Sequence, residues 1–289
     1  MKILIFLWAL MVPNLLFLQQ IADTTYNPII KNPAYEVGNG PVVYIDEGHH
    51  NFHTKNGRYK AFSDLLERDG YQVMEYTGVF KAHDLSKGKI LVISNALNEV
   101  NVEDWFLPTP SAFTKPEIEV VKKWVADGGC LFLIADHMPM AGAAKDLAAG
   151  FGFEFTNGFV FDTVANGPAY FNLKENTLTE SVITKGRDSS ESVQQIASFT
   201  TFDKNYMNML PDTAWVFNDR TPKFNAQGWS QGAYKKHGKG KIAVFGEAAM
   251  FTAQIAGPNK IKMGMNNEVA PENYQLLLNI MHWLDGKLE

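Results

Sequence analysis

The sequence predicts an α/β protein built on a doubly wound, mostly parallel sheet, and three observations lead to this fold class. Short, continuously apolar runs alternate with stretches of helical spacing through the first half of the chain. The apolar runs lack polar alternation, which is typical of strands buried on both faces of a parallel sheet. Turn and cap residues separate the runs at intervals that suit strand–helix–strand units.

The first unit begins with the apolar run 41–45, which we expect to be a strand. Residues 59–68 have apolar side chains at helical spacing, and Asp69-Gly70 ends that helix before a second strand at 71–76. A third strand is expected over 89–94, and its lack of alternation predicts burial on both faces.

The next helix begins with a recognisable cap. Thr114 stands three residues before Glu117, with Pro116 between them in the first turn, which is the pattern of a capping box. A fourth strand over 130–135 and a helix rich in small residues over 141–151 continue the alternation.

The second half of the chain is less regular. Residues 153–234 contain short aromatic stretches, such as 159–161 and 214–217, separated by Gly, Pro, Asn and Asp, and predict a β-rich insertion. After it we expect a hairpin with strands at 228–234 and 241–245, and then a final amphipathic helix at 272–284. Residues 24–289 are thus expected to form one α/β domain.

Residues 1–22 resemble a secretory signal peptide, because Met1-Lys2 is followed by an apolar run interrupted by Pro13. We therefore expect a secreted or periplasmic protein whose only membrane attachment would be this segment, if it is left uncleaved. A net charge of −5 without a basic stripe argues against a nucleic-acid partner. One cysteine, Cys130, leaves no internal disulfide, so packing of the 46% hydrophobic residues must stabilise the fold.

The predicted strands place ionisable residues at one edge of the sheet. The first strand ends in Asp46-Glu47-Gly48-His49-His50, with His53 close behind, the third in Ser94-Asn95, the fourth in Asp136-His137 and the late strand in Gly246-Glu247. The amino ends of the same strands carry few ionisable residues. In an open parallel sheet, ligands bind beyond the carboxyl ends of the strands. The sequence therefore predicts a site at this rim, although each Asp or Asn there would also suit a turn or cap.

Two kinds of chemistry suit these residues. A divalent metal such as zinc could take imidazole and carboxylate ligands, and otherwise a carboxylate could act as general base with an imidazole as acid. We expect His49 and His53 to be metal ligands, and the rim residues to come together in space. The expected catalytic residues are Asp46, Glu47, His137 and Glu247; the expected ligand-binding residues are His50, Asn95, Asp136 and Asn267.

Three stretches resemble an uncharacterised group of secreted bacterial proteins: DEGHHNFHT at 46–54, WVADGGCLFLIADHMP at 124–139 and GKIAVFGEAAMF at 240–251. That group is similar to the class I glutamine amidotransferase-like fold, a flavodoxin-like sheet. The resemblance covers residues 41 to about 284, with the weakest likeness across 153–234, and it implies the fold more than any activity.

Two activities are disfavoured by the sequence. Glutaminase chemistry needs a cysteine nucleophile after a central strand, but that turn reads Asp136-His137-Met138, and Cys130 begins its strand at the opposite rim. Gly228-Trp229-Ser230-Gln231-Gly232 matches the serine-hydrolase elbow, but a hairpin follows Ser230 where the elbow needs a helix.

The expected function is a hydrolase acting on a small or carbohydrate-like extracellular molecule through the His and carboxylate rim, with possible metal assistance. The sequence has no glycine-rich loop of the kinds that bind nucleotide phosphates, which argues against a nucleotide substrate. The alternative is a binding module for a glycan or other small ligand without turnover. The aromatic residues of 153–234 favour this second possibility.

Overall fold

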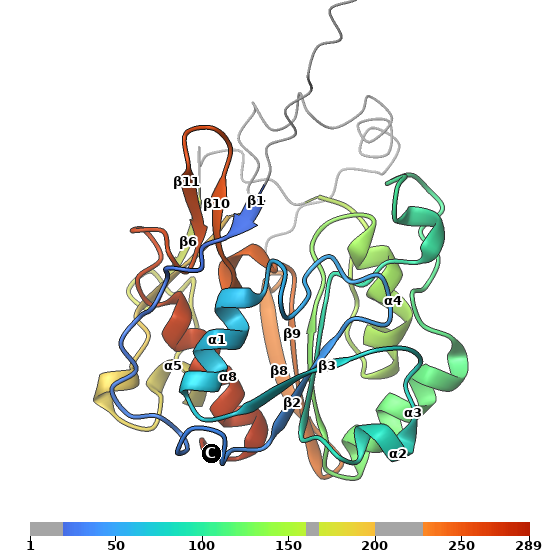
Figure 1. Ribbon diagram of the computed structural model, residues 1–289, viewed down its shortest axis with the longest axis horizontal. Coiled ribbons are helices and arrows are strands. Elements are labelled where there is room, and N and C mark those ends of the chain that lie inside the picture. Colours follow the sequence, from blue (N-terminus) through green and yellow to red (C-terminus); the bar gives the residue numbers. More distant parts are fainter. Residues whose placement is uncertain (1–19, 160–167, 200–227) are drawn as a thin grey trace, which may run out of the picture.

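A six-stranded, mostly parallel sheet forms the centre of the computed structural model, which describes residues 20–159, 168–199 and 228–289 (Figure 1). The strand order is β3-β2-β4-β5-β9-β8. Only β8, at one edge, runs antiparallel to its neighbour. The strands are β2 (Val42–Asp46), β3 (Gln72–Tyr76), β4 (Ile90–Ser94), β5 (Cys130–Ile134), β8 (Gly232–His237) and β9 (Gly240–Phe245). The predicted strands are confirmed to within a few residues, including the hairpin of β8 and β9.

The order of the parallel strands creates a switch point between β2 and β4. The chain passes from β2 outward to β3 on one side, then returns to β4 and continues through β5 to β9 on the other side. Loops that leave β2 and β4 therefore diverge at the carboxyl edge, which is where open α/β sheets bind ligands.

Helices cover both faces of the sheet (Figure 1). One face carries α1 (Lys60–Arg68) and α8 (Asn273–Asp285), and the other carries α2 (Ala82–Leu85), α3 (Lys115–Ala126) and α4 (Met140–Gly150). Successive strand residues point to opposite faces, so Phe132 packs in the cluster with α1 and α8 while Leu131 packs in the cluster with α3 and α4. The sheet is thus buried on both sides, as its apolar strands predict.

The predicted capping box at the start of α3 is confirmed. The Thr114 backbone N–H donates to Glu117 Oε2 at 3.0 Å, and the Glu117 backbone N–H donates to Thr114 Oγ1 at 3.4 Å. These reciprocal bonds satisfy backbone donors that the first helical turn leaves without partners. They also fix the position of the Glu117 side chain, which matters below.

Two small antiparallel sheets extend the fold. One has the order β1-β10-β11, with β1 at Gln20–Ala22, β10 at Ala253–Ala256 and β11 at Ile261–Gly264. The other pairs β6 (Ala169–Asn172) with β7 (Gln195–Ser198) inside the predicted β-rich insertion, beside the short helix α5 (Val182–Lys185). The connections also form short 3₁₀ helices: η1 (Glu99–Asn101), η2 (Ser189–Glu191) and η3 (Ala249–Phe251).

Several predicted segments cannot be compared with the structure. Residues 1–19, 160–161 and 214–217 lie outside the described residues. The last three residues of the expected signal peptide are described, however, and they form β1, which pairs with β10. In the described part of the chain, no helix is long and apolar enough to span a membrane.

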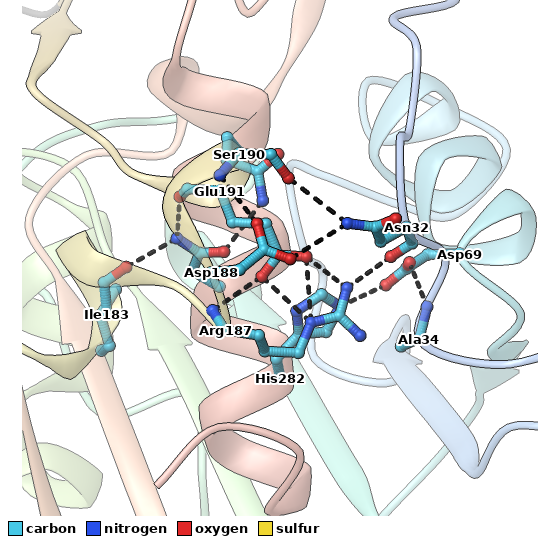
Figure 2. Close-up of polar contacts among 11 residues, drawn as sticks. Asn32, Ala34, Asp69, Ile183, Arg187, Asp188, Ser190, Glu191 and His282 are labelled. Carbon is cyan, nitrogen blue, oxygen red and sulfur yellow. Dashed lines mark hydrogen bonds and ion pairs between the residues drawn. The ribbon is translucent and has the colours of Figure 1, made fainter.

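A partly buried polar cluster holds the N-terminal arm and the 181–191 segment against α8 (Figure 2). His282 Nε2 lies 2.6 Å from Asp69 Oδ2. Arg187 pairs with Glu191 and donates to the Asn32 carbonyl oxygen. Asp69 is the C-cap of α1, three residues before β3 begins, so this cluster lies at the amino end of the sheet, away from the predicted rim. Its interactions are among protein groups, and we assign it a structural role.

Candidate functional site

The loop that follows β2 crosses the carboxyl edge of the sheet and is tied to its neighbours. The Glu47 N–H donates to the Tyr76 carbonyl oxygen at 2.8 Å, and the Phe52 N–H donates to the Asn95 carbonyl oxygen at 3.0 Å. A Cβ at Gly48 would lie 2.3 Å from the Gly78 carbonyl oxygen, so this close approach requires glycine. Backbone hydrogen bonds and this close approach therefore hold the loop that carries several of the expected site residues in one conformation.

His49 lies between two carboxylates. Its Nδ1 is 2.9 Å from Asp46 Oδ2 and its Nε2 is 3.0 Å from Glu117 Oε1. The imidazole also packs against Phe80 and Phe113, with ring centroids 4.4 and 4.8 Å away. His49 thus joins the end of β2 to the beginning of α3 inside the core on the α3 side of the sheet.

The charges in this triad favour a protonated His49. Burial alone would lower the pKa of His49, but its hydrogen bonds to Asp46 and Glu117 and the charges of these carboxylates outweigh burial and raise it. Burial raises the pKa of Asp46 despite its bonds to His49. Thr114, His49 and the Phe80 N–H stabilise the charged form of Glu117, and together they overcome its burial and lower its pKa. Both His49 ring nitrogens are engaged, so we assign the triad a structural role.

His53 lies on the other side of the sheet. Its ring packs on Tyr59 at 4.7 Å, and Tyr59 belongs to the core under α1 and α8. Burial, with a smaller effect from the charge of Arg58, lowers the pKa of His53 to about 3, so it is neutral near pH 7.

The expected pairing of His49 with His53 is therefore not present. A left-handed backbone at His50, with φ of 48°, turns the loop between them and sends the two imidazoles to opposite faces. Among residues 20–159, 168–199 and 228–289, no three His, Cys, Asp or Glu side chains are grouped to hold a metal ion.

Asn95 and Asp136 join the ends of β4 and β5. The Asn95 Nδ2 donates to Asp136 Oδ2 at 2.7 Å, and the Asp136 N–H donates to Asn95 Oδ1 at 2.8 Å. The other Asp136 oxygen accepts from the Ala248 N–H beyond β9. Burial raises the pKa of Asp136, although the neighbouring His137 opposes that change. The structure thus unites two expected ligand-binding residues, with Asn95 supporting Asp136.

A cavity of about 910 Å³ opens at the carboxyl ends of β5 and β9, and Asp136 and His137 are part of its wall. The His137 Nδ1 lies 2.6 Å from the Met138 carbonyl oxygen, which can only accept. Nδ1 therefore carries the proton and Nε2 is the basic nitrogen. Burial lowers the pKa of His137, which favours this neutral form near pH 7, although the Asp136 charge opposes the shift.

Aromatic side chains dominate the rest of this cavity. Phe159 stacks on His137 at 4.5 Å, while Tyr170 and Trp229 line the cavity with 44% and 52% of their surfaces exposed. Glu154 and Glu175 add carboxylates to the lining. The sequence indicated aromatic residues in this region but not which of them share a cavity, because β6, β7 and β8 are brought together only by the fold.

The remaining expected site residues lie apart from this cavity's lining. Glu47 Oε1 accepts from the Lys55 N–H at 2.7 Å and closes its own loop, and His50 is exposed. Glu247 is buried and accepts from the Phe199 N–H at 2.7 Å. Asn267 donates to the Lys262 carbonyl oxygen at 2.6 Å, at the end of the β10–β11 hairpin, so it stabilises a turn. Glu47 and Asp46 thus have structural partners in the fold, and their expected catalytic roles stay predictions.

Cys130 begins its strand as the sequence analysis expects, whereas Ser230, expected inside a strand, precedes one. The buried Cys130 Sγ donates to the Leu284 carbonyl oxygen at 2.8 Å, which is a structural contact between β5 and α8. Ser230 lines the cavity but precedes β8, with no helix directly after it. The strand–serine–helix geometry of a nucleophile elbow is thus missing at this position.

No protein-family model matches the chain, and no curated protein matches it. A solved structure described as "mmIFT52 N-terminal domain" is similar with a TM-score of 0.53 and 14% identity, over 84% of this chain and 96% of that one. Two cytoplasmic proteins from Salmonella typhimurium, the first from strain LT2, give TM-scores of 0.44 and 0.42. Their identities are 14% and 12%, over 84% of this chain and 98% of each of theirs. The first likeness supports the mixed α/β fold alone, and the amidotransferase-like resemblance stays a prediction.

Proposed function

We propose that the chain hydrolyses a small, carbohydrate-like molecule bound in the 910 Å³ cavity, with His137 as the general base. The observation that carries this proposal is the fixed tautomer of His137 in the cavity wall. Its Nδ1 donates to the Met138 carbonyl oxygen, so Nε2 is the ring nitrogen whose lone pair can act as a base.

The reaction would be a direct displacement by water. His137 Nε2 takes one proton from water while the water oxygen bonds to the electrophilic carbon of the substrate. The bond from that carbon to its leaving oxygen breaks, the leaving oxygen takes a proton from bulk water, and His137 returns its proton to the solvent. Asp136 is a positioning residue here, because both its carboxylate oxygens already accept hydrogen bonds from Asn95 and Ala248. No metal enters the scheme, since the ring nitrogens of His49 are already engaged by Asp46 and Glu117.

The lining of the cavity favours a carbohydrate-like ligand. Trp229 and Tyr170 offer exposed aromatic surface for the apolar face of a sugar ring, and Glu154 and Glu175 offer acceptors for its hydroxyl groups. A strongly anionic substrate would instead be repelled by these carboxylates.

A second candidate function is ligand binding without turnover. The exposure of Tyr170 and Trp229 favours it, because such aromatic platforms bind sugars without requiring any acid–base group. In that case His137 would serve only as part of the wall.

The finer fold and the location belong to the same proposal. Numbered along the chain, the five parallel strands have the order 2-1-3-4-5, which supports a flavodoxin-like sheet and, with it, the amidotransferase-like resemblance. The apolar segment after Lys2 supports export, and a secreted or periplasmic protein would meet extracellular glycans.

The test compares His137→Gln with His50→Gln, which removes an exposed histidine of the same rim. Chromogenic glycosides and esters would be assayed with each purified variant. Loss of His137 should lower kcat/KM by about 10²–10⁴-fold, and loss of His50 should not. Hydrolysis that is equal in both variants contradicts the proposal. Sugar binding that Trp229→Ala abolishes, in a chain that hydrolyses none of the panel, supports the second candidate.

A further inference from the structure

The β10–β11 hairpin projects from the body of the molecule, and β1 lies beside it (Figure 1). β1 is antiparallel to β10, with Gln20 opposite Ala256, and Ala256 is opposite Ile261, the first residue of β11. The chain therefore enters β1 at the tip of the hairpin. Leu18, the last residue of the apolar run 3–18, is two positions before Gln20, so that run ends within about 7 Å of β1.

The tip of the hairpin combines apolar and basic side chains at the surface. Ile261 is 56% exposed and stands between Lys260 and Lys262, which are also exposed. Among the described residues, neither lysine forms an ion pair. Lys262 lies near Asp23, but that carboxylate is buried and already accepts a bond from Asn266 at 2.9 Å. An apolar side chain flanked by free ammonium groups suits the anionic surface of a lipid bilayer.

The one small residue that could precede a signal cleavage site lies inside this sheet. Signal peptides end in small residues, and Ala22 is the only Ala, Gly or Ser between Leu10 and Asp23. Ala22 is opposite Gln254 in the pairing of β1 with β10, and the Asp23 N–H donates to the Ala253 carbonyl oxygen at 2.8 Å. A cut after Ala22 would remove β1 and leave a charged α-amino group on Asp23, which is only 6% exposed. The fold thus uses residues that signal cleavage would remove.

A retained apolar run would draw the hairpin to the membrane surface. The 16 residues of 3–18 would span about 24 Å as a helix, whereas the hydrocarbon core of a bilayer is about 30 Å thick. A short span pulls its flanking residues toward the lipid headgroups. Lys2 precedes the run, and no basic residue follows it before Lys31, which favours an N-terminus on the cytoplasmic side and a domain on the outer side.

We infer that residues 3–18 are retained as a membrane anchor and that the tip of the β10–β11 hairpin, at Lys260, Ile261 and Lys262, rests on anionic lipid headgroups beside it. The inference does not depend on the hydrolysis proposed above. It places the domain at the outer face of a membrane, held by its anchor and by one adjoining surface.

The first test examines the full-length chain expressed in a bacterial host. The protein should sediment with the membranes, resist extraction by high salt and alkaline carbonate, and dissolve in detergent. Its intact mass should include residues 1–22. A mature chain that begins at Asp23, or any other product without the apolar run, overturns the inference.

The second test locates the hairpin tip in the full-length chain, reconstituted into vesicles of phosphatidylcholine and phosphatidylglycerol. An environment-sensitive fluorophore is attached to Ile261→Cys or, as a control, to His83→Cys, an exposed position of α2 at the opposite end of the molecule (Figure 1). Cys130 is buried and should stay unlabelled. Nitroxide-labelled headgroups should quench the fluorophore at position 261 and not the one at position 83. Equal quenching at the two positions, or none at position 261, overturns the hairpin contact.

The third test removes the charge of the tip. Lys260→Gln combined with Lys262→Gln should lower the ratio of docked to free tips, measured by quenching at position 261, at least about tenfold in these vesicles. Lys235→Gln combined with Lys236→Gln, at exposed positions of β8, is the matched control and should leave the ratio unchanged. Quenching that is the same in both double variants overturns the assignment of the lysines to anionic headgroups.

Discussion

His49 Nε2 lies 3.0 Å from Glu117 Oε1, and this contact joins residues 68 positions apart in the sequence. Because Asp46 holds the other ring nitrogen, one imidazolium neutralises part of the charge of two buried carboxylates. The contact fixes the rim loop to the first turn of α3, whose capping box holds Glu117 in place.

Replacing His49 with Gln should destabilise the protein strongly. The change leaves Asp46 and Glu117 buried without a cation between them, and breaking a buried pair in this way costs about 3–5 kcal/mol. Urea denaturation gives the free energy of unfolding. Lys123→Ala, which removes an exposed i,i+4 pair with Asp127, is the control and should have no measurable effect. Equal stabilities for the two variants would contradict the role of the triad.

The stabilisation from His49 should depend on pH. Its folded-state pKa is raised, so its contribution is complete below the unfolded-state pKa of about 6.5 and is lost as pH rises through the folded-state value. The difference in unfolding free energy between wild type and His49→Gln should therefore shrink from pH 6 to pH 9. A difference that is constant over this range would show that His49 is not protonated in the fold.

Much of the fold could be predicted because its cues are local. The Thr114, Pro116 and Glu117 spacing identifies the start of α3 from four consecutive residues. The continuous apolar runs identify the buried strands for the same reason. By contrast, β1, β10 and β11 have three or four residues each, too few for a period of two to be recognised, and β1 pairs with β10 across more than 230 positions.

The site was less predictable because side-chain direction depends on the loop backbone. The spacing of His49 and His53 is compatible with a shared ligand, but the left-handed conformation of His50 separates them. The role of Glu117 as a partner of His49 has no sequence cue, because its capping function already accounts for it. Asp136 and His137 were predicted correctly to lie at the strand end, whereas the cavity beside them depends on β6 and β8.

His53 should make the protein sensitive to acid. Its folded-state pKa of about 3 lies below the unfolded value of about 6.5, so only the unfolded chain takes up the proton as pH falls. Stability from this group is complete above pH 6.5 and is lost below it, by about 1.4 kcal/mol per pH unit. His53→Phe should flatten the pH dependence between pH 6 and pH 4 by this amount. His83→Gln, at an exposed position, should leave the slope of the wild type unchanged.

Asn279→Leu should release the 181–191 segment from α8. The buried Asn279 Nδ2 donates to the carbonyl oxygens of Ile183 at 2.7 Å and Glu191 at 2.8 Å, beside the cluster in Figure 2. Leucine has a similar volume but leaves both oxygens without this donor, at a cost of about 2–5 kcal/mol. Denaturation measures that cost, and limited proteolysis should show faster cleavage near Arg187. Gln275→Ala removes a half-buried partner of Asn279 and should cost far less; a comparable loss would contradict the assignment.

Substitutions at Asn95 should separate backbone strain from support of Asp136. Asn95 has a φ of 55°, which glycine adopts freely and alanine does not. Asn95→Gly should therefore lose only the two hydrogen bonds to Asp136, about 1–3 kcal/mol, and Asn95→Ala should lose about 1 kcal/mol more through strain. Both variants leave the Asp136 carboxylate held by the Ala248 N–H alone, so both should lower hydrolysis to a similar extent. Equal stability of the Gly and Ala variants would contradict the strain, and unchanged kcat/KM in both would show that Asp136 does not position His137.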